Sequence, residues 1–384
     1  MEQLSSAQEI ATAGSPRIKP NASMLFKRYF LLALLLCTWL PIAFFILLAP
    51  PAAGTGSLAG IKTVFLFLGT AHVPATLFFY TDKEFFSIIK DHKLRYVYLP
   101  ICLTLTTGLL FAVLSNVAQA FLLLAYWSWQ AFHYGRQNIG VYAFASIAQT
   151  GTAPHPAEKM AIDFGTILGI LGTFKILGTA VAPVYLHSTF DHLYLFGSVT
   201  FAAVLIFSLG VYVKFYRDTS VLKTLFFFTS VFFFYPVFIS TNMNIAFLSY
   251  AMAHGLQYLI FMTVVSANAS RGDQPRSVPY RNIWKLAIFV LVVGFLFWRV
   301  GDLKQLEVVR NSWLYTAVAD FLFGAVLGAT MSHFVVDASA WKLSMAPQRA
   351  YISRRFDFLF AKKTESSEGG KEVPPLASKS PQKI

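Results

Sequence analysis

The sequence is poor in charge and in cysteine. Charged residues make up 13% of the 384 residues, whereas soluble domains carry roughly 25%. The two cysteines, Cys37 and Cys102, form no CxxC pair, so neither a disulfide framework nor a thiolate metal cluster is indicated. The histidine motifs HEXXH and paired EXXH are also absent. These absences argue against a soluble domain and against the common zinc and di-iron signatures.

Apolar sequence takes the place of the missing charge. Apolar residues make up 56% of the chain, the mean hydropathy is +0.58, and apolar runs of about 20 residues recur from Leu31 to Val335. We therefore predict an all-α, polytopic membrane protein with about ten transmembrane helices. In a bacterium it would lie in the cytoplasmic membrane. The predicted spans cover residues 29–50, 58–80, 96–115, 118–140, 160–184, 193–213, 222–240, 242–267, 283–300 and 313–336.

Four regions follow from this pattern. A polar N-terminal tail (1–27) precedes the transmembrane domain (28–340), and a Ser-, Pro- and Lys-rich tail (364–384) is predicted to be disordered. Between them, the basic and aromatic segment 341–363 is expected either to lie along the membrane as an interfacial helix or to be a loose tail attracted to anionic lipid.

The basic residues indicate the orientation of the chain. Lysine and arginine gather before the odd-numbered spans and in the C-terminal tail, which predicts that both termini are cytoplasmic. The net charge of +13 therefore reports topology, and no nucleic-acid partner is expected.

Four histidines lie inside separate apolar runs: His72, His133, His254 and His333. Ionisable groups within a membrane are costly and are candidates for function. All four fall on even-numbered spans, which run from the outside to the cytoplasm, at middle to inner depth. We predict that they form one metal or cofactor site. The alternatives are a proton or substrate pathway, and hydrogen bonds that only hold helices together.

Polar residues one helical turn away can support these imidazoles. Gln137, Tyr258 and Asp337 each follow one of the histidines by four residues, and Thr76 follows His72 in the same way. Such neighbours can orient the second ring nitrogen of a metal-bound imidazole. We predict a catalytic role for Asp337, Tyr258 and Gln137.

Two further residues are predicted to bind substrate. Tyr134 and Arg136 lie near the inner end of the span that carries His133. A guanidinium there can hold a lipid phosphate or a carboxylate in bidentate fashion, or can simply anchor the span at the cytoplasmic face.

The predicted cofactor is a metal ion, with iron favoured, because imidazole and carboxylate donors without thiolates suit it. Haem b held by two histidines, and copper, are the alternatives.

Lone histidines on separate membrane helices resemble the bacterial Brp/Blh carotenoid dioxygenases, which are histidine-ligated iron enzymes. The resemblance is one of architecture. The segments around His133 (FHYGRQ) and His333 (SHFVVD) match no motif of that family, and the close histidine pair typical of it is missing here. The resemblance implies a metal held by membrane histidines that acts on apolar molecules, and it does not imply retinal formation.

The predicted function is that of an integral membrane, metal-dependent oxidoreductase or oxygenase acting on a lipid or isoprenoid. The bilayer, an apolar substrate and a redox partner are its expected partners. A proton-coupled transporter, a b-type haem protein and a non-catalytic scaffold are the alternatives.

Overall fold

The computed structural model describes residues 20–48, 67–215, 220–240, 242, 244–269, 280–303 and 312–360. Within these ranges the chain is helical and contains no β-strand. The predicted all-α class is confirmed. The tail 364–384 and residues 1–19 of the N-terminal tail lie outside the described residues, so the predictions made for them are not addressed.

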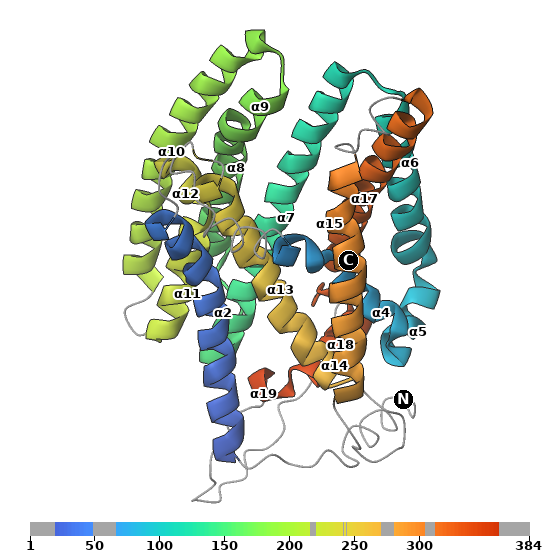
Figure 1. Ribbon diagram of the computed structural model, residues 1–384. Helices are drawn as coiled ribbons and strands as arrows, with labels where there is room; N and C mark the ends of the chain where they lie inside the picture. Colours follow the sequence, from blue (N-terminus) through green and yellow to red (C-terminus); the bar gives the residue numbers. More distant parts are fainter. Residues whose placement is uncertain are drawn as a thin grey trace, which may run out of the picture.

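Long helices lie side by side in a bundle (Figure 1). They are α2 (Pro20–Leu48), α6 (Leu99–Val113), α7 (Asn116–Thr150), α8 (Pro156–Thr173), α10 (His187–Phe215), α13 (Ser249–Ala267), α14 with α15 (Tyr280–Ile288 and Gly294–Leu303) and α17 (Trp313–Ala340). Shorter helices complete the fold: η1 (Val73–Leu77), α4 (Phe78–Thr81), α5 (Lys83–Asp91), α11 (Val221–Val231), α12 (Pro236–Ile239), α18 (Ala346–Arg355) and α19 (Asp357–Phe360).

Seven helices in the described part of the chain are long and apolar enough to cross a membrane, as expected of a multi-pass membrane protein. They are Met24–Leu47, Leu94–Val113, Pro156–Val181, Val184–Phe215, Ile245–Ala267, Asn282–Val300 and Trp313–Ala340. The other three predicted spans have different forms. Span 118–140 lies within α7, which is long but richer in polar residues, span 222–240 is divided into shorter helices, and span 58–80 is described only from residue 67.

Glycines bring α17 against α6. Gly324 and Gly328 are four residues apart and therefore share one face of α17. A Cβ atom on Gly324 would lie 2.5 Å from the carbonyl oxygen of Thr107, and one on Gly328 would lie 2.6 Å from that of Leu103. Small residues allow this approach, which is a common way to pack membrane helices. The contact holds the helix that carries His333.

A second close approach brings α7 against α8. A Cβ atom on Gly135 would overlap the side chain of Thr166, so only glycine fits there. Gly135 lies two residues after His133, and the contact therefore positions that histidine.

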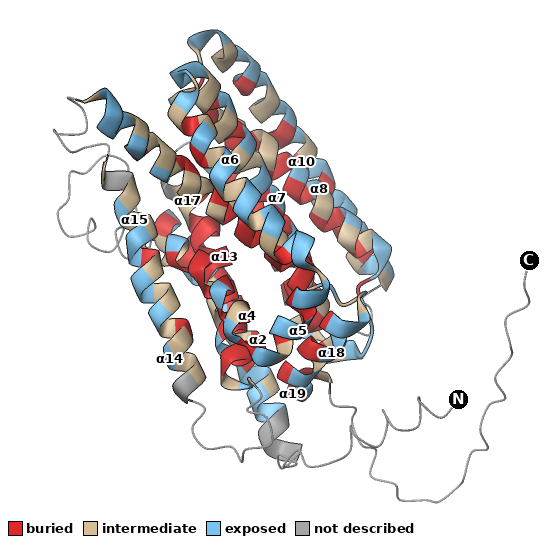
Figure 2. Cartoon of the chain, turned by 90° about the vertical axis from the view of Figure 1, so that its right-hand side faces the viewer, coloured by how far each residue is buried: buried red, intermediate tan, exposed pale blue. Residues whose placement is uncertain are grey.

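The burial pattern is that of a helical bundle. Buried residues gather on the inward faces of α7, α8 and α13, and exposed residues lie on the outer faces (Figure 2).

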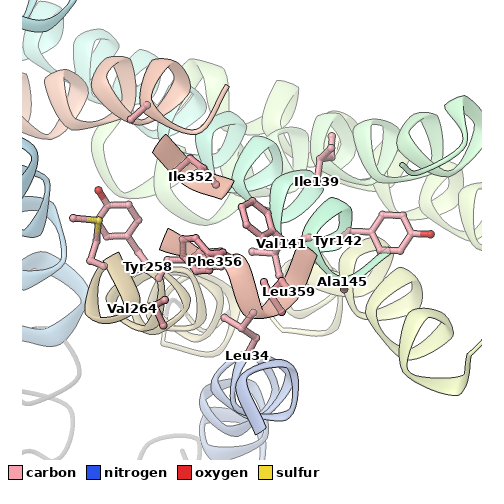
Figure 3. Close-up of a cluster of buried hydrophobic side chains, with 14 of the residues drawn as sticks. Leu34, Ile139, Val141, Tyr142, Ala145, Tyr258, Val264, Ile352, Phe356 and Leu359 are labelled. Atoms are coloured by element: carbon pink, nitrogen blue, oxygen red, sulfur yellow. The ribbon is translucent and has the colours of Figure 1, made fainter. Parts of the chain in front are cut away.

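The C-terminal segment packs into the protein. Up to residue 360 the segment expected at the membrane surface forms α18 and α19, and Ile352, Phe356 and Leu359 are buried in an apolar cluster with Leu34 of α2 (Figure 3). It is therefore neither a loose tail nor a helix lying only on a surface. The reason is its apolar content, since these side chains leave water by packing against α2, α7 and α13.

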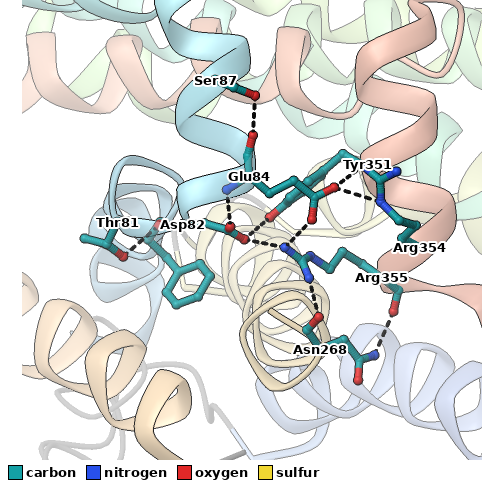
Figure 4. A network of polar contacts seen from close by, with 9 residues as sticks. Thr81, Asp82, Glu84, Ser87, Asn268, Tyr351, Arg354 and Arg355 are labelled. Carbon is teal, nitrogen blue, oxygen red and sulfur yellow. Dashed lines mark hydrogen bonds and ion pairs between the residues drawn. The ribbon is translucent and has the colours of Figure 1, made fainter. Parts of the chain in front are cut away.

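A buried ion network fixes α18 in place (Figure 4). Arg355 Nη2 lies 2.8 Å from Asp82 Oδ2 and 2.9 Å from Glu84 Oε2. The Tyr351 hydroxyl donates to the same Asp82 oxygen at 2.8 Å, and the Asn268 side chain donates to the Arg355 carbonyl at 2.7 Å. Burial, together with the nearby Asp82 carboxylate, raises the pKa of Tyr351 well above its usual range, so this phenol remains a neutral donor. The network joins α18 to α5 and to the end of α13.

Replacing Arg355 with Met is expected to destabilise the protein by about 3–5 kcal/mol, because the buried Asp82 carboxylate loses its charged partner. The neighbouring substitution Arg354→Met is the matched control. The Arg354 side chain is 61% exposed and pairs with Glu84, so its loss is expected to cost about 0–1 kcal/mol. Unfolding of both variants in detergent measures the difference, and equal losses would contradict the proposed role of the network.

Candidate metal centre

The first histidine of the site lies where a helix is interrupted. His72 occupies a turn between the helical residues 67–71 and the 3-10 helix η1, whose second residue is Pro74. Proline has no backbone N–H, so the regular α-helical hydrogen bonding stops here. The His72 Nδ1 atom lies 2.6 Å from the Gly69 carbonyl oxygen. Since a carbonyl only accepts, Nδ1 carries the proton and Nε2 presents a lone pair.

The four histidines meet in the interior. The Nε2 atoms of His72 and His254 are 3.1 Å apart. The ring centroids of His72 and His333 are 5.1 Å apart, and the His133 ring lies 5.0 Å from that of His254 and 5.3 Å from that of His333. Each residue is at most 6% exposed. The structure thus brings together four residues that the sequence placed on separate spans. They come from the turn before η1 and from α7, α13 and α17.

Asp337 completes the cluster. Its Oδ2 atom lies 3.6 Å from His333 Nε2 and 3.9 Å from His133 Nε2. Two overlapping sets of possible ligands result, and in each the ligand atoms all lie within 4.8 Å of one another. One set is His72, His254 and His333, and the other is His133, His333 and Asp337. These buried groups are positioned to hold a metal ion.

A directed chain of hydrogen bonds sets the protonation of His333. The Tyr258 hydroxyl donates to Asp337 Oδ1 at 2.7 Å, so its oxygen is left to accept from the Thr76 hydroxyl at 2.9 Å. The Thr76 oxygen then accepts from His333 Nδ1, which lies 2.5 Å away. His333 Nε2 therefore holds a lone pair, and it points toward the Asp337 carboxylate.

Three ring nitrogens of the site are buried without a hydrogen-bond partner: His133 Nε2, His333 Nε2 and His254 Nδ1. An unpaired buried polar atom costs about 1–3 kcal/mol. At His333, the lone pair faces a carboxylate oxygen, an arrangement that is repulsive without a proton or a cation between the two. A metal ion satisfies such atoms, because neutral imidazole nitrogen and carboxylate oxygen are both metal ligands.

The histidine rings are fixed by their neighbours. The His133 ring stacks on Phe334 with centroids 4.2 Å apart, and the Tyr134 ring lies 4.0 Å from the His254 ring. Gly255 leaves room for His72, since a Cβ atom there would lie 3.1 Å from its Nδ1. The site is therefore rigid and closely packed.

Two of the predicted site residues have other partners. Arg136 was expected to bind substrate, but its half-exposed side chain pairs with Asp163 of α8 at 3.1 Å and belongs to the outside of the bundle. Gln137 donates to the His254 carbonyl at 3.1 Å and to the Gln257 side chain at 3.3 Å, so its hydrogen bonds join α7 to α13. Tyr134 lies beside the site, and its hydroxyl accepts from Gln130 at 2.5 Å.

One supporting residue contacts a different histidine from the one that its spacing predicts. Thr76 was expected to support His72, four residues earlier, but it hydrogen-bonds His333 instead. The 3-10 winding of η1 turns Thr76 away from the direction it would have in a continuous α-helix. The stacking of Phe334 on His133 was missed altogether, because nothing in the spacing of the sequence indicates it.

Comparison with known proteins adds no assignment: no family model matches the chain, and no curated protein and no solved structure matches it. The class of the protein therefore rests on its fold and site. It is a multi-pass helical membrane protein with a buried histidine and aspartate cluster positioned to hold a metal ion.

Purified protein is expected to carry about one metal ion per chain, and His254→Ala or His333→Ala is expected to lose most of it. Elemental analysis of the purified protein measures the content. The substitution His192→Ala is the control, since His192 is exposed and only hydrogen-bonds the Ser188 carbonyl of its own helix. Wild-type protein without stoichiometric metal, even after incubation with Fe²⁺, Zn²⁺ or Cu²⁺, would contradict the assignment.

Thr76→Val is expected to weaken metal binding by about 10–100-fold, because it removes the acceptor that holds the His333 ring. Thr263→Val on α13 is the matched control, since Thr263 is exposed and bonds only to the Leu259 carbonyl. Titration of the metal-free proteins with Co²⁺, followed by its visible absorption, compares the affinities. Equal affinities would show that the hydrogen-bond chain does not orient a ligand.

Proposed function

We propose that the protein is an integral membrane oxidoreductase with a non-haem iron ion held by His72, His133, His254 and His333 beside Asp337. The observation that carries this proposal is that two buried ring nitrogens without a hydrogen-bond partner, His133 Nε2 and His333 Nε2, lie beside the same Asp337 oxygen. Packing alone does not account for it, since histidines that merely join helices would each find a partner.

The donor set favours iron. Neither possible set of ligands contains a thiolate, and imidazole with carboxylate is the combination found in non-haem iron oxygenases.

The spacing of the His72 and His254 nitrogens argues against haem. Two histidines on opposite faces of a haem iron hold their nitrogens about 4 Å apart, twice an iron–nitrogen bond of about 2 Å. The Nε2 atoms of His72 and His254 are 3.1 Å apart, so this pair is too close to hold a haem iron.

We also propose that the chain crosses the membrane about ten times, with both termini in the cytoplasm. Helix α7 has 35 residues, which is about 52 Å of helix and enough to cross despite its polar residues. The segments 67–81 and 221–239 lie among the long helices and would complete two further crossings (Figure 1). This orientation follows the basic loops and puts the site at middle to inner depth.

The surroundings of the site suit a water-free reaction on a lipid or isoprenoid. When bound, the metal would activate dioxygen or polarise the substrate, with electrons from a redox partner. Asp337 and Tyr258 would hold and move a proton at the edge of the site, since they share a hydrogen bond of 2.7 Å. Tyr134 would cover the His254 ring, and Gln137 would keep α13 in place.

Protein loaded anaerobically with Fe²⁺ is expected to bind nitric oxide, a probe for an open iron position, and to give the electron paramagnetic resonance signal of a high-spin iron adduct. His72→Ala should lose the signal together with the iron, and His192→Ala should keep it. An intense Soret band in the protein as purified would instead identify haem. Stoichiometric iron without any nitric oxide adduct would contradict an oxygen-activating site.

A further inference from the structure

An apolar cavity lies on the flank of the bundle between α6, α7 and α17. Its volume is about 240 Å³, and its polar side-chain groups are the hydroxyl groups of Thr106, Thr107 and Tyr126 and the indole N–H of Trp129. The rest of the lining is apolar: Leu103, Leu110, Phe111, Leu122, Ala125, Leu327 and Met331. No charged residue lines it, so the cavity suits a hydrocarbon and offers nothing to hold a charged or strongly polar ligand.

Part of the cavity lining lies on the same face of α7 as His133. Trp129 of its lining precedes His133 by four residues on α7, so the two side chains share one face of that helix. The cavity therefore approaches His133 along α7.

The cavity also opens to the outside of the bundle. Thr106, Ala125 and Trp129 in its lining are exposed residues. They belong to α6 and α7, and the neighbouring outer surface of α6 is made of exposed leucines such as Leu105 and Leu109. An exposed surface of this kind on a membrane protein faces lipid, so an apolar molecule would reach the cavity from the bilayer.

We propose that this cavity binds the hydrocarbon chain of the substrate, a lipid or isoprenoid that enters sideways from the bilayer between α6 and α7. Its bound chain would lie one helical turn from His133. This inference rests on the proposed function, and it goes further by assigning the residues that select an apolar substrate.

A photoreactive fatty acid with a mid-chain diazirine tests the proposal. The full-length protein is reconstituted in phosphatidylcholine nanodiscs with this probe, irradiated and digested, and the labelled residues are mapped by mass spectrometry. Labelling is expected to concentrate in residues 103–111, 122–129 and 327–331. The substitution Ala125→Trp, which fills the cavity, should reduce this labelling several-fold, and the milder Leu122→Phe should reduce it less.

The chain offers a matched control. A second apolar hollow of about 230 Å³ lies between α8 and α10, which carry none of the four site histidines. It too is lined by an exposed alanine, Ala203. Ala203→Trp should leave the labelling between α6 and α7 unchanged. Two results would overturn the proposal: equal labelling of both hollows, or labelling between α6 and α7 that neither Ala125→Trp nor Leu122→Phe reduces. In either case the probe would report ordinary lipid contact.

Metal content measured on the same samples separates the two proposals. Wild-type protein without metal would refute the proposed function, whatever the labelling shows. Metal-loaded protein without concentrated labelling would refute only the chain-binding cavity. Ala125→Trp protein that keeps the wild-type metal content but loses the labelling would show that the cavity acts independently of the metal site, as we infer.

Discussion

The structure depends on one requirement: polar groups buried among apolar helices must be satisfied by one another, because water is not at hand to replace a missing partner. Around the site the chain meets part of this requirement itself. The Gly69 carbonyl fixes one imidazole, and Thr76 with Tyr258 links another to Asp337. Three ring nitrogens remain buried without a hydrogen-bond partner, and two of them lie beside Asp337. A cation bound by their lone pairs would offset the cost of burying them. Histidines with a purely structural role would leave this cost uncompensated.

Close helix packing makes this convergence possible. Imidazoles from four segments can approach to within about 5 Å, centroid to centroid, only where the helix backbones are themselves close. Gly255, next to His254, allows the segment that carries His72 to come close. Gly135 and Gly328 hold the helices that carry His133 and His333 against α8 and α6. His72 reaches the site because its helix is broken. The same small residues that pack the bundle thus also build the site.

The two sides of the site differ in polarity. Toward the predicted cytoplasmic end, α18 packs on Phe79, three residues beyond Thr76, and is held there by the ion network of Arg355. On the flank, the apolar cavity reaches the lipid-facing surface of α6 and α7. These surroundings agree with the apolar substrate that we propose. The ion network also holds the C-terminal segment against the rest of the fold.

Composition and spacing alone determined the helical class, the membrane character and the identity of the buried histidines, because length, apolar runs and the cost of intramembrane charge are properties that a single segment carries. Asp337 and Tyr258 were also found in this way, since each lies one turn from a histidine. Only the tertiary structure decided which polar residues support which imidazole. Thr76 serves His333, Gln137 bridges backbones, and Arg136 turns outward to Asp163. The physical reason is that a helical repeat predicts which residues share a face, whereas a local break such as η1 and the packing of other helices decide what that face meets.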